Sequence, residues 1–488
     1  MIPVLLILIP LLAGLASFFI KNEKTARAWA LLAAIVTLGV SLLGITVITD
    51  ARHLQHECRW MESIGASFSV KLDGMGQLLC LLNAVAYPVV LLATWKTNYR
   101  KANNFFALML LAQAGMMGVF LAMDALLFYF FWELALIPMY FLCSQWGGER
   151  RIAVTFKFFI YTFIGSLLML VGILYIWSKS ADHSFSISSF YTLWVTPKEQ
   201  LFLFWLFFAA FAIKMPIFPL HTWQPDTYEQ APAATTMILS GVMVKMGVFG
   251  IVRWLMPVLP YSSFMWGDMV TAFAVTGMIY ASLIAIRQDS LRKLVAYSSI
   301  AHIGLMCAAV FSETESGVQG AMIQMFSHGI NIIGLWIVVG IIERQFGVKK
   351  ISELGGLAQK APSMTIMFVI VALANIALPL TNAFAGEFLM FNGVFNSLGS
   401  KYPVLLTVLA GTSIILAAVY TLNMIRKVFY GHTNELTATI TDLGLTEKIA
   451  LGAIVAMIFV FGVYPQALLN LTQEFTDTFL SKVVLVKK

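Results

Sequence analysis

The sequence predicts an all-α polytopic membrane protein with about 14 transmembrane helices, and three observations lead to this fold class. The 488 residues are 60% hydrophobic and only 11% charged, whereas soluble domains carry roughly 25% charged residues. Apolar runs of about 20 residues, the length needed to cross a bilayer, recur from one end of the chain to the other. The loops between these runs are short and polar, so they leave no room for a soluble catalytic domain.

The apolar runs predict spans near residues 2–20, 28–49, 75–95, 104–122, 125–146, 154–177, 201–220, 229–255, 263–286, 292–311, 318–342, 363–392, 403–425 and 447–470. The first run has no basic segment before it and no small-residue cleavage site, so we interpret it as a span. The loop at 50–74 is too polar to span. Phe68, Val70 and Leu72 alternate with polar residues there, which predicts a strand of a hairpin capped by an Asp-Gly turn.

Basic residues concentrate in alternate loops, and this asymmetry predicts the orientation. The first loop carries Lys21, Lys24 and Arg27, the third, fifth, ninth, eleventh and thirteenth loops are also basic, and the fourth and tenth loops lack Lys and Arg. The second loop is an exception with three basic residues. By the positive-inside rule the odd loops face the cytoplasm and both termini face the periplasm. The net charge of +7 follows from these loops and does not indicate nucleic-acid binding.

Two spans contain prolines beside an ionisable residue. Pro216 and Pro219 follow Lys214 in span 7, and Pro379 precedes Glu387 in span 12. Proline interrupts helical hydrogen bonding, and irregular backbone is tolerated at membrane depth only where protein or water covers it. The breaks lie five spans apart, an odd spacing that reverses topology. The sequence therefore predicts inverted repeats of spans 4–8 and 9–13 with broken helices 7 and 12.

This repeat divides the chain into four parts. We expect N-terminal spans 1–3 in 1–103, the first repeat in 104–255, the second repeat in 256–430, and span 14 with its tail in 431–488.

Six ionisable residues lie inside apolar runs, namely Glu133, Lys214, Lys245, His302, His328 and Glu387. Such a group is costly in hydrocarbon, by about 2.5–3.5 kcal/mol on insertion scales for Lys or Asp, and usually faces a bundle interior or a water-filled path. They lie one per span, in spans 5, 7, 8, 10, 11 and 12, and this arrangement suggests a proton or ion route. Lysine changes its protonation readily when it is desolvated, so a Glu–Lys pair also offers a switch.

A structural interpretation stays open for each of these residues. Glu133 and the lysines would then only join helices, and a buried neutral histidine bonded to a carbonyl is as probable as a proton relay. Asp226 and Glu229, at the junction of spans 7 and 8, fit an ordinary solvated loop as well as proton uptake. Asp124 begins span 5 and is expected to cap it.

Several chemistries have no motif in the sequence. Neither G-x-x-x-x-G-K-[ST] nor G-x-G-x-x-G occurs, which argues against an ATP motor or a Rossmann-type NAD site. The cysteines Cys58, Cys80, Cys143 and Cys307 are scattered without a C-x-x-C, so no disulfide framework, metal or iron–sulfur site is indicated. We expect no cofactor in this chain.

Four motifs carry a resemblance to a known family. F-F-W-E-L-A-L-I-P-M-Y-F-L, F-A-I-K-M-P-I-F-P-L-H-T-W-Q-P-D, L-R-K-L-V-A-Y-S-S-I-A-H-I-G and A-G-E-F resemble the antiporter-like subunits of bacterial proton-pumping NADH:quinone oxidoreductase, respiratory complex I. The resemblance covers nearly the whole chain. The G-E-F at 386–388 resembles subunit M, where relatives generally have a lysine. Two positions depart from the family pattern, namely Tyr228 in place of a histidine and Leu380 in place of a glycine.

The resemblance implies roles and partners. Glu133 matches the span-5 glutamate, Lys214 its lysine partner and Lys245 the central lysine, while the two histidines and Glu387 match the polar axis and its terminal carboxylate. It implies a bacterial inner membrane and neighbouring antiporter-like subunits L and N, with the lateral helix of L. FMN, iron–sulfur clusters and quinone are expected in partner subunits. The alternatives are a subunit of a multi-subunit cation/proton antiporter, a membrane-bound hydrogenase subunit, or a structural membrane spacer.

Overall fold

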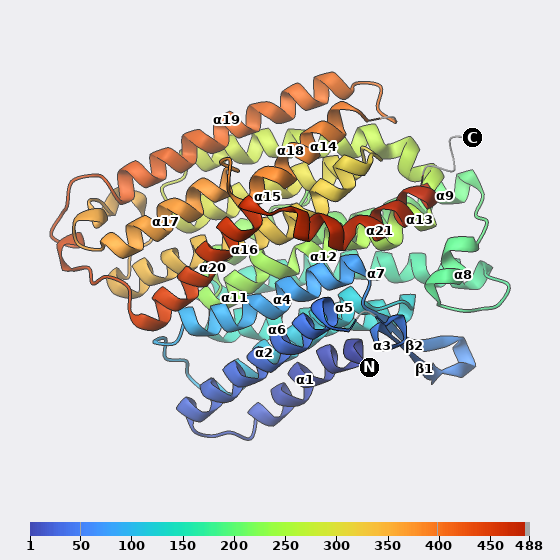
Figure 1. Cartoon of the computed structure of the whole chain (residues 1–488), viewed down its shortest axis with the longest axis horizontal. Coiled ribbons are helices and arrows are strands. Elements are labelled where there is room, and N and C mark those ends of the chain that lie inside the picture. The colour runs from blue at the N-terminus through green and yellow to red at the C-terminus, as the bar shows by residue number, and fades with distance from the viewer. Residues whose placement is uncertain (49, 398, 484–488) are drawn as a thin grey trace.

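Long helices lying side by side form the protein, as the computed structural model, which describes residues 1–48, 50–397 and 399–483, shows (Figure 1). Within these residues, eleven helices are long and apolar enough to cross a membrane, and the shorter helices Ile2–Ser17 (α1) and Pro362–Asn375 (α17) are also apolar. The prediction of an all-α, multi-pass membrane protein is therefore confirmed.

The other helices, including the eleven long ones, follow in chain order, and most of them coincide with predicted spans. They are α2 (Glu23–Thr46), α4 (Gly74–Ala93), α5 (Ala102–Leu121), α6 (Ala125–Trp146), α7 (Arg151–Lys179), α9 (Pro197–Lys214), α10 (Trp223–Gln230), α11 (Ala233–Ile238), α12 (Lys245–Gly250), α13 (Met256–Val258), α14 (Pro260–Arg287), α15 (Leu291–Val310), α16 (Glu315–Phe346), α18 (Asn382–Phe395), α19 (Pro403–Val428), α20 (Leu445–Val463) and α21 (Gln466–Val483). Two short helices, α3 (Ala51–Leu54) and α8 (Ile187–Thr192), lie in loops.

Helices at the centre of the bundle are buried, and those at its edges are not. In Figure 1, α1 and α2 lie along one edge and α19 lies along the opposite edge. In the most apolar 18-residue stretch of each helix, all residues of the segment Ala233–Val258 and 94% of those of α16 are buried, whereas in α2 and α19 only 33% are. The edge helices therefore offer their apolar faces to lipid or to partner subunits, and the central helices hold side chains that lipid cannot reach.

The loop at 50–74 forms the predicted hairpin. Strands β1 (Gln55–Met61) and β2 (Ala66–Lys71) pair antiparallel at one end of the bundle (Figure 1). The Asp-Gly turn is placed differently, because Asp73 caps α4 by accepting from the Gly76 amide, and the hairpin turns at 62–65. Asp124 caps α6 as predicted and also accepts from the Ser67 amide at 2.9 Å, which ties the hairpin to the bundle.

A second tie at this end is a buried ion pair. Arg253 donates to both carboxylate oxygens of Asp73 at 2.6 and 2.7 Å, with both side chains largely buried. Burial raises the pKa of Asp73, but the charge and hydrogen bonds of Arg253 outweigh burial and hold that pKa below its usual value. The pair fixes the start of α4 against the segment Ile251–Leu255.

The chain leaves the helical path after α9, where prolines lie. Trp223 donates from its indole nitrogen to the Ile213 carbonyl at 2.9 Å, and the Ile217 amide donates to Ala212 at 2.9 Å. These bonds satisfy carbonyls that a continuing helix would have used. Lys214 is consequently the last residue of α9.

A second irregular segment, 376–381, separates α17 from α18. Ala377 and Leu380 adopt φ of +55° and +72° there, the left-handed region that glycine occupies more easily. The backbone shape that a glycine would favour is therefore kept although Leu380 occupies the position. Gly462 of α20 lies against this segment, and a Cβ there would be 2.1 Å from the Leu380 carbonyl oxygen.

The predicted end of span 14, near 470, is wrong. The helix α20 stops at Val463, and after Pro465 a second helix, α21, continues to Val483. Thr472 and Thr476 of α21 are fully buried and donate to carbonyls of their own helix, so this segment packs on the protein despite its polar sequence. The hydropathy pattern placed the end of the span near residue 470 because threonines and charged residues begin there.

Close packing of α5 on α6 depends on glycine, and this generates a prediction. A Cβ at Gly115 would lie 2.6 Å from the Ala135 backbone nitrogen, which cannot move without shifting α6. Gly115→Ala is expected to destabilise the protein by about 1–3 kcal/mol through overpacking, seen as a lower unfolding temperature in detergent. Gly411→Ala of α19, where nothing lies within 4 Å, is the control and should be neutral or stabilising. Equal effects would contradict the interpretation.

Candidate functional site

Glu133 and Lys214 come from neighbouring elements of the first half of the bundle. Lys214 is 2% exposed, and its ammonium lies 5.2 Å from the Trp132 ring centroid in a cation–π arrangement. The Glu133 carboxylate lies within electrostatic range of this lysine, but no ion pair joins the two among the described residues. The Trp132 ring thus helps to hold the cation beside, and not against, the carboxylate.

Lys245 sits at a local distortion of its helix. The residues before it, Leu239–Met243, form a π-helical segment, a feature frequent at functional sites. The wider turn leaves the Ser240 carbonyl open to the Lys245 ammonium, which donates to it at 2.7 Å. The lysine is fully buried, so this carbonyl supplies part of the solvation that water would give.

The two histidines continue from Lys245. The ammonium of Lys245 and Nδ1 of His328 are 2.9 Å apart, and the ring centroids of His328 and His302 are 5.4 Å apart. On its other side, His302 has its Nε2 3.3 Å from the amide nitrogen of Asn375, the last residue of α17. A continuous row of polar groups therefore runs from α12 through α16 and α15 to the irregular segment after α17.

Glu387 lies on α18 and shares a small cavity with His302. The cavity has a volume of about 20 Å³, and Tyr420 of α19 also lines it. Glu387 is 7% exposed, and its Oε2 has no hydrogen-bond partner among the described residues. The carboxyl group is thus separated from His302 by the width of a cavity instead of by packed apolar side chains.

The six predicted residues fall into two groups, and the contacts within each group are closer than those between the groups. Lys245, His328 and His302 contact one another in sequence, and Glu387 shares a cavity with His302. Glu133 and Lys214 form a separate pair, and no direct contact joins Lys214 to Lys245 among the described residues. Five of the six are buried, and Glu133 is partly buried.

Sequence reasoning missed the residues that solvate this row. Ser240 and Asn375 are ordinary helix residues in the sequence, and their roles follow from contacts that join distant spans. Asn382 is similar, since its side-chain oxygen accepts from Asn331 at 3.0 Å. A signal existed for two of them, because Asn375 and Asn382 flank the proline that predicted the break.

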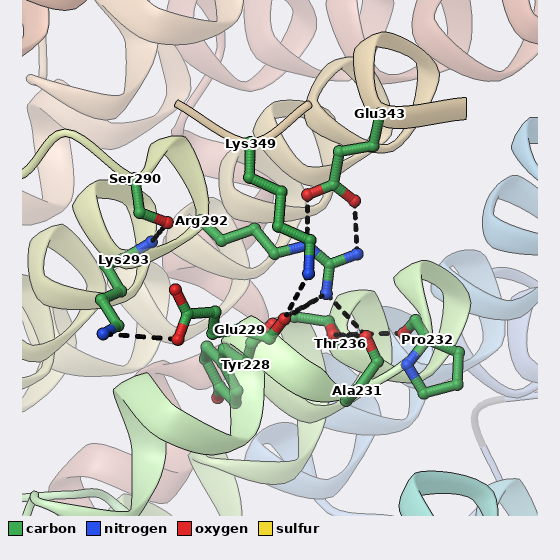
Figure 2. A network of polar contacts seen from close by, with 10 residues as sticks. All are labelled: Tyr228, Glu229, Ala231, Pro232, Thr236, Ser290, Arg292, Lys293, Glu343 and Lys349. Atoms are coloured by element: carbon green, nitrogen blue, oxygen red, sulfur yellow. Dashed lines mark hydrogen bonds and ion pairs between the residues drawn. The ribbon is translucent and has the colours of Figure 1, made fainter. Parts of the chain in front are cut away.

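A polar network holds the element that follows the first break, as Figure 2 shows. Arg292 of α15 donates to both oxygens of Glu343 of α16, at 2.6 and 2.5 Å. Its remaining nitrogen donates to the carbonyls of Tyr228, Glu229 and Ala231 at 3.1, 3.1 and 2.7 Å. These carbonyls lie at the end of α10, where helix carbonyls lack partners. The network joins α10 to the two helices that carry the histidines.

The acidic residues of this loop have cationic partners. Asp226 pairs with Lys157 at 2.9 Å, and Glu229 pairs with Lys293 at 3.3 Å and with Arg150 at 3.7 Å. Tyr228, which stands where the family has a histidine, is fully buried. These ion pairs favour the structural interpretation of the loop.

Comparisons with known proteins agree with the arrangement. The family model described as NADH:quinone oxidoreductase/Mrp antiporter, transmembrane, matches residues 122–415, a range that includes all six candidate residues. NADH-quinone oxidoreductase subunit M of Rickettsia bellii is 37% identical over 87% of this chain and 85% of its own. F420H2 dehydrogenase subunit M of Methanosarcina mazei is 33% identical over 99% of each chain.

A solved structure also matches. A chain of respiratory complex I from Thermus thermophilus with bound NADH superposes with a TM-score of 0.90 at 26% identity, covering 99% of this chain and 100% of that one.

The Arg292 network generates a stability prediction. Arg292→Met leaves the buried Glu343 carboxylate unpaired and frees the α10 carbonyls, which is expected to cost about 3–5 kcal/mol. The measurement is the unfolding temperature of the detergent-solubilised protein. Arg52→Met is the matched control, because its ion pair with Asp50 is exposed, with side chains 88% and 42% accessible, and should leave stability unchanged. The interpretation fails if both variants behave alike.

Proposed function

The chain belongs to the NADH:quinone oxidoreductase/Mrp antiporter family of membrane subunits, and we propose that it is a proton-translocating membrane subunit of an NADH:quinone oxidoreductase. In this function, electron transfer from NADH to quinone in partner subunits is coupled to proton pumping through this chain. FMN, iron–sulfur clusters and quinone belong to those partners. The subunit is thus part of a translocase, and its own chemistry is proton transfer.

The observation that carries the proposal is the contact between Lys245 and His328. Their nitrogens are 2.9 Å apart, and the side chains are 0% and 1% exposed. Two cations at this distance in a low-dielectric interior repel strongly, so the two side chains carry at most one positive charge between them, and a proton bound here is shared by the pair. A structural spacer would need no such pair, since an amide or a hydroxyl would join the helices without a charge in the membrane.

The remaining titratable groups lie on either side of the Lys245–His328 pair and provide further sites along a proton path. Lys214 lies beside Glu133 on one side, and His302 with Glu387 lies on the other. A change in the distance between Glu133 and Lys214 alters the electrostatic field at Lys245. That change moves the shared proton toward or away from His328. A signal at one end of the chain of groups is in this way converted into proton movement at the other end.

We extend the proposal to topology and partners. Counting α1, α9 and α17–α18 with the eleven long apolar helices gives 14 spans, with inverted repeats of spans 4–8 and 9–13 and with both termini on the periplasmic side of a bacterial inner membrane. The positions of the two irregular segments, 215–222 and 376–381, support the repeat. The neighbours would be the antiporter-like subunits L and N, with the lateral helix of L. In a cation/proton antiporter, the alternative assembly, transport would require Na⁺ and no electron donor.

The Glu133–Lys214 pair gives the first functional prediction. Glu133→Gln and Lys214→Ala are each expected to lower proton pumping by about tenfold or more while the complex still assembles. Glu133→Asp should retain part of the activity because it keeps a titratable carboxylate. The measurement is proton uptake coupled to NADH oxidation in inverted membrane vesicles. Normal coupled pumping in Glu133→Gln would refute the switch.

Glu387 gives a second prediction. Glu387→Gln should impair turnover strongly, because an amide accepts a hydrogen bond but cannot take a proton. Glu387→Lys should recover little, since the surrounding groups suit an anion. The readouts are NADH–quinone turnover and proton uptake. If Glu387 only formed hydrogen bonds to the irregular segment, the Gln variant would be nearly as active as the parent. That result would show that Glu387 is not part of the proton pathway.

A further inference from the structure

Tyr420 of α19 lies between two cavities. On one side is the cavity of about 20 Å³ that contains His302 and Glu387, here called the chamber. On the other side is a larger cavity of about 420 Å³, here called the vestibule, which Tyr420 lines with Gln288, Asp289, Asn423 and Lys427. Tyr420 is therefore the residue that the two cavities share, one of them open toward the surface and the other containing the buried acid.

The vestibule lies at the predicted cytoplasmic ends of its helices. Gln288 and Asp289 follow the last residue of α14, and Lys427 is in the last turn of α19. Both belong to odd-numbered loops, which the positive-inside rule places in the cytoplasm. Polar and apolar side chains line the vestibule in equal measure, and Tyr420 is among them, so the polar part of its wall can hold water next to the tyrosine.

Two of the polar groups around the chamber have unsatisfied hydrogen-bonding capacity. The Tyr420 hydroxyl, on a side chain only 2% exposed, and Oε2 of Glu387 bond to no described group. The Ser298 hydroxyl of α15 lies near Tyr420; because it donates to Val295, it can serve Tyr420 only as an acceptor, and the Tyr420 oxygen is left to accept from a water. Buried polar groups are nearly always hydrogen-bonded. A water needs about 10–15 Å³ and two to four polar partners, and the chamber meets both conditions.

We propose that Tyr420 is a proton-conducting gate between the cytoplasmic vestibule and a single-water site in the chamber. The proposal rests on the proposed function and adds to it a proton uptake route into the second half of the chain. Tyrosine suits the task because its hydroxyl both donates and accepts, while its ring closes the passage to ions.

The transfer step balances. A hydronium ion in the vestibule gives a proton to the Tyr420 oxygen as the tyrosine gives its own hydroxyl proton to the chamber water. That water passes one of its protons to the Glu387 carboxylate. For every O–H bond that breaks, another forms, and the tyrosine and the water end neutral. The positive charge of the hydronium and the negative charge of Glu387 both disappear, and His302 can then take the proton from the acid.

The first test removes the hydroxyl. Tyr420→Phe in the complete complex should lower proton uptake and coupled NADH–quinone turnover about tenfold or more. Tyr87→Phe is the matched control, because its hydroxyl is also buried without a described partner and lies outside the path. Normal activity in Tyr420→Phe, or an equal loss in Tyr87→Phe, would overturn the proposal.

The second test fills the chamber and leaves the titratable groups in place. Ala417 lines the chamber and Ala418, the next residue, does not. Ala417→Val should displace the water and reproduce the loss seen in Tyr420→Phe, while Ala418→Val on the same helix should be nearly normal. If Ala417→Val pumps normally, no water site is required and the proposal is overturned.

The third test addresses the vestibule. In a Cys58→Ser background, which removes the exposed native cysteine, Asn423→Cys is treated with a bulky, membrane-impermeant maleimide. Labelling of inverted vesicles, whose cytoplasmic face is outward, should slow proton uptake to the Tyr420→Phe level. Labelling of right-side-out vesicles should not. A labelled protein with normal uptake would overturn the vestibule route.

A combination of variants separates this proposal from the proposed function. Because Tyr420 acts through Glu387, Tyr420→Phe should cause no further loss in a Glu387→Gln background. If the activity losses of the two variants add up in the double variant, Tyr420 does not act through Glu387, and the proposed gate is overturned. If Glu387→Gln is impaired and Tyr420→Phe is normal, only the gate fails. If Glu133→Gln, Lys245→Met and Glu387→Gln all pump normally, the proposed function itself fails.

Discussion

Charge inside an apolar helix bundle is the constraint on which this structure depends. Lipid offers no hydrogen bonds, so each buried ionisable group needs a partner from the protein or from enclosed water. The irregular features of the fold lie where such partners are needed. The π-helical segment before Lys245 gives that lysine a carbonyl, and the end of α17 places Asn375 at His302. Elsewhere the buried charges are paired with opposite charges, as Arg253 is with Asp73 and Arg292 is with Glu343.

The same constraint explains the contact between the two halves of the chain. Lys245 belongs to the first proposed repeat, while His328 and His302 belong to the second. A shared proton at this contact is a charge that either half can attract. The Arg292 network joins the halves again at the end of α10 with a fully paired charge. One junction is therefore rigid and the other can change its protonation, which is what coupled proton transfer requires.

Hydropathy predicted the helices because bilayer thickness sets their length, and the rarity of charge in apolar runs predicted all six candidate residues. The sequence could not predict what depends on contacts between distant spans, such as the Asn375–His302 bond or the cavity position of Tyr420. A tyrosine in an apolar helix gives no signal of its own. Helix α21 was missed because hydropathy counts its threonines as polar. In the fold these threonines are buried, and their hydroxyls donate to carbonyls of the same helix.

Charge balance explains why a carboxylate at position 387 suits this chain. Counted as formal charges with neutral histidines, two carboxylates (Glu133 and Glu387) balance two ammonium groups (Lys214 and Lys245), so the row sums to zero. A lysine at position 387 would leave two uncompensated positive charges, which burial penalises heavily. A proton added to the neutral row makes it cationic, and the nearest site that can remove this charge is a carboxylate at one of its two ends. In the proposed route, protonation of Glu387 through Tyr420 would remove a negative charge that attracts the proton shared by Lys245 and His328, and it would favour movement of that proton toward Glu133.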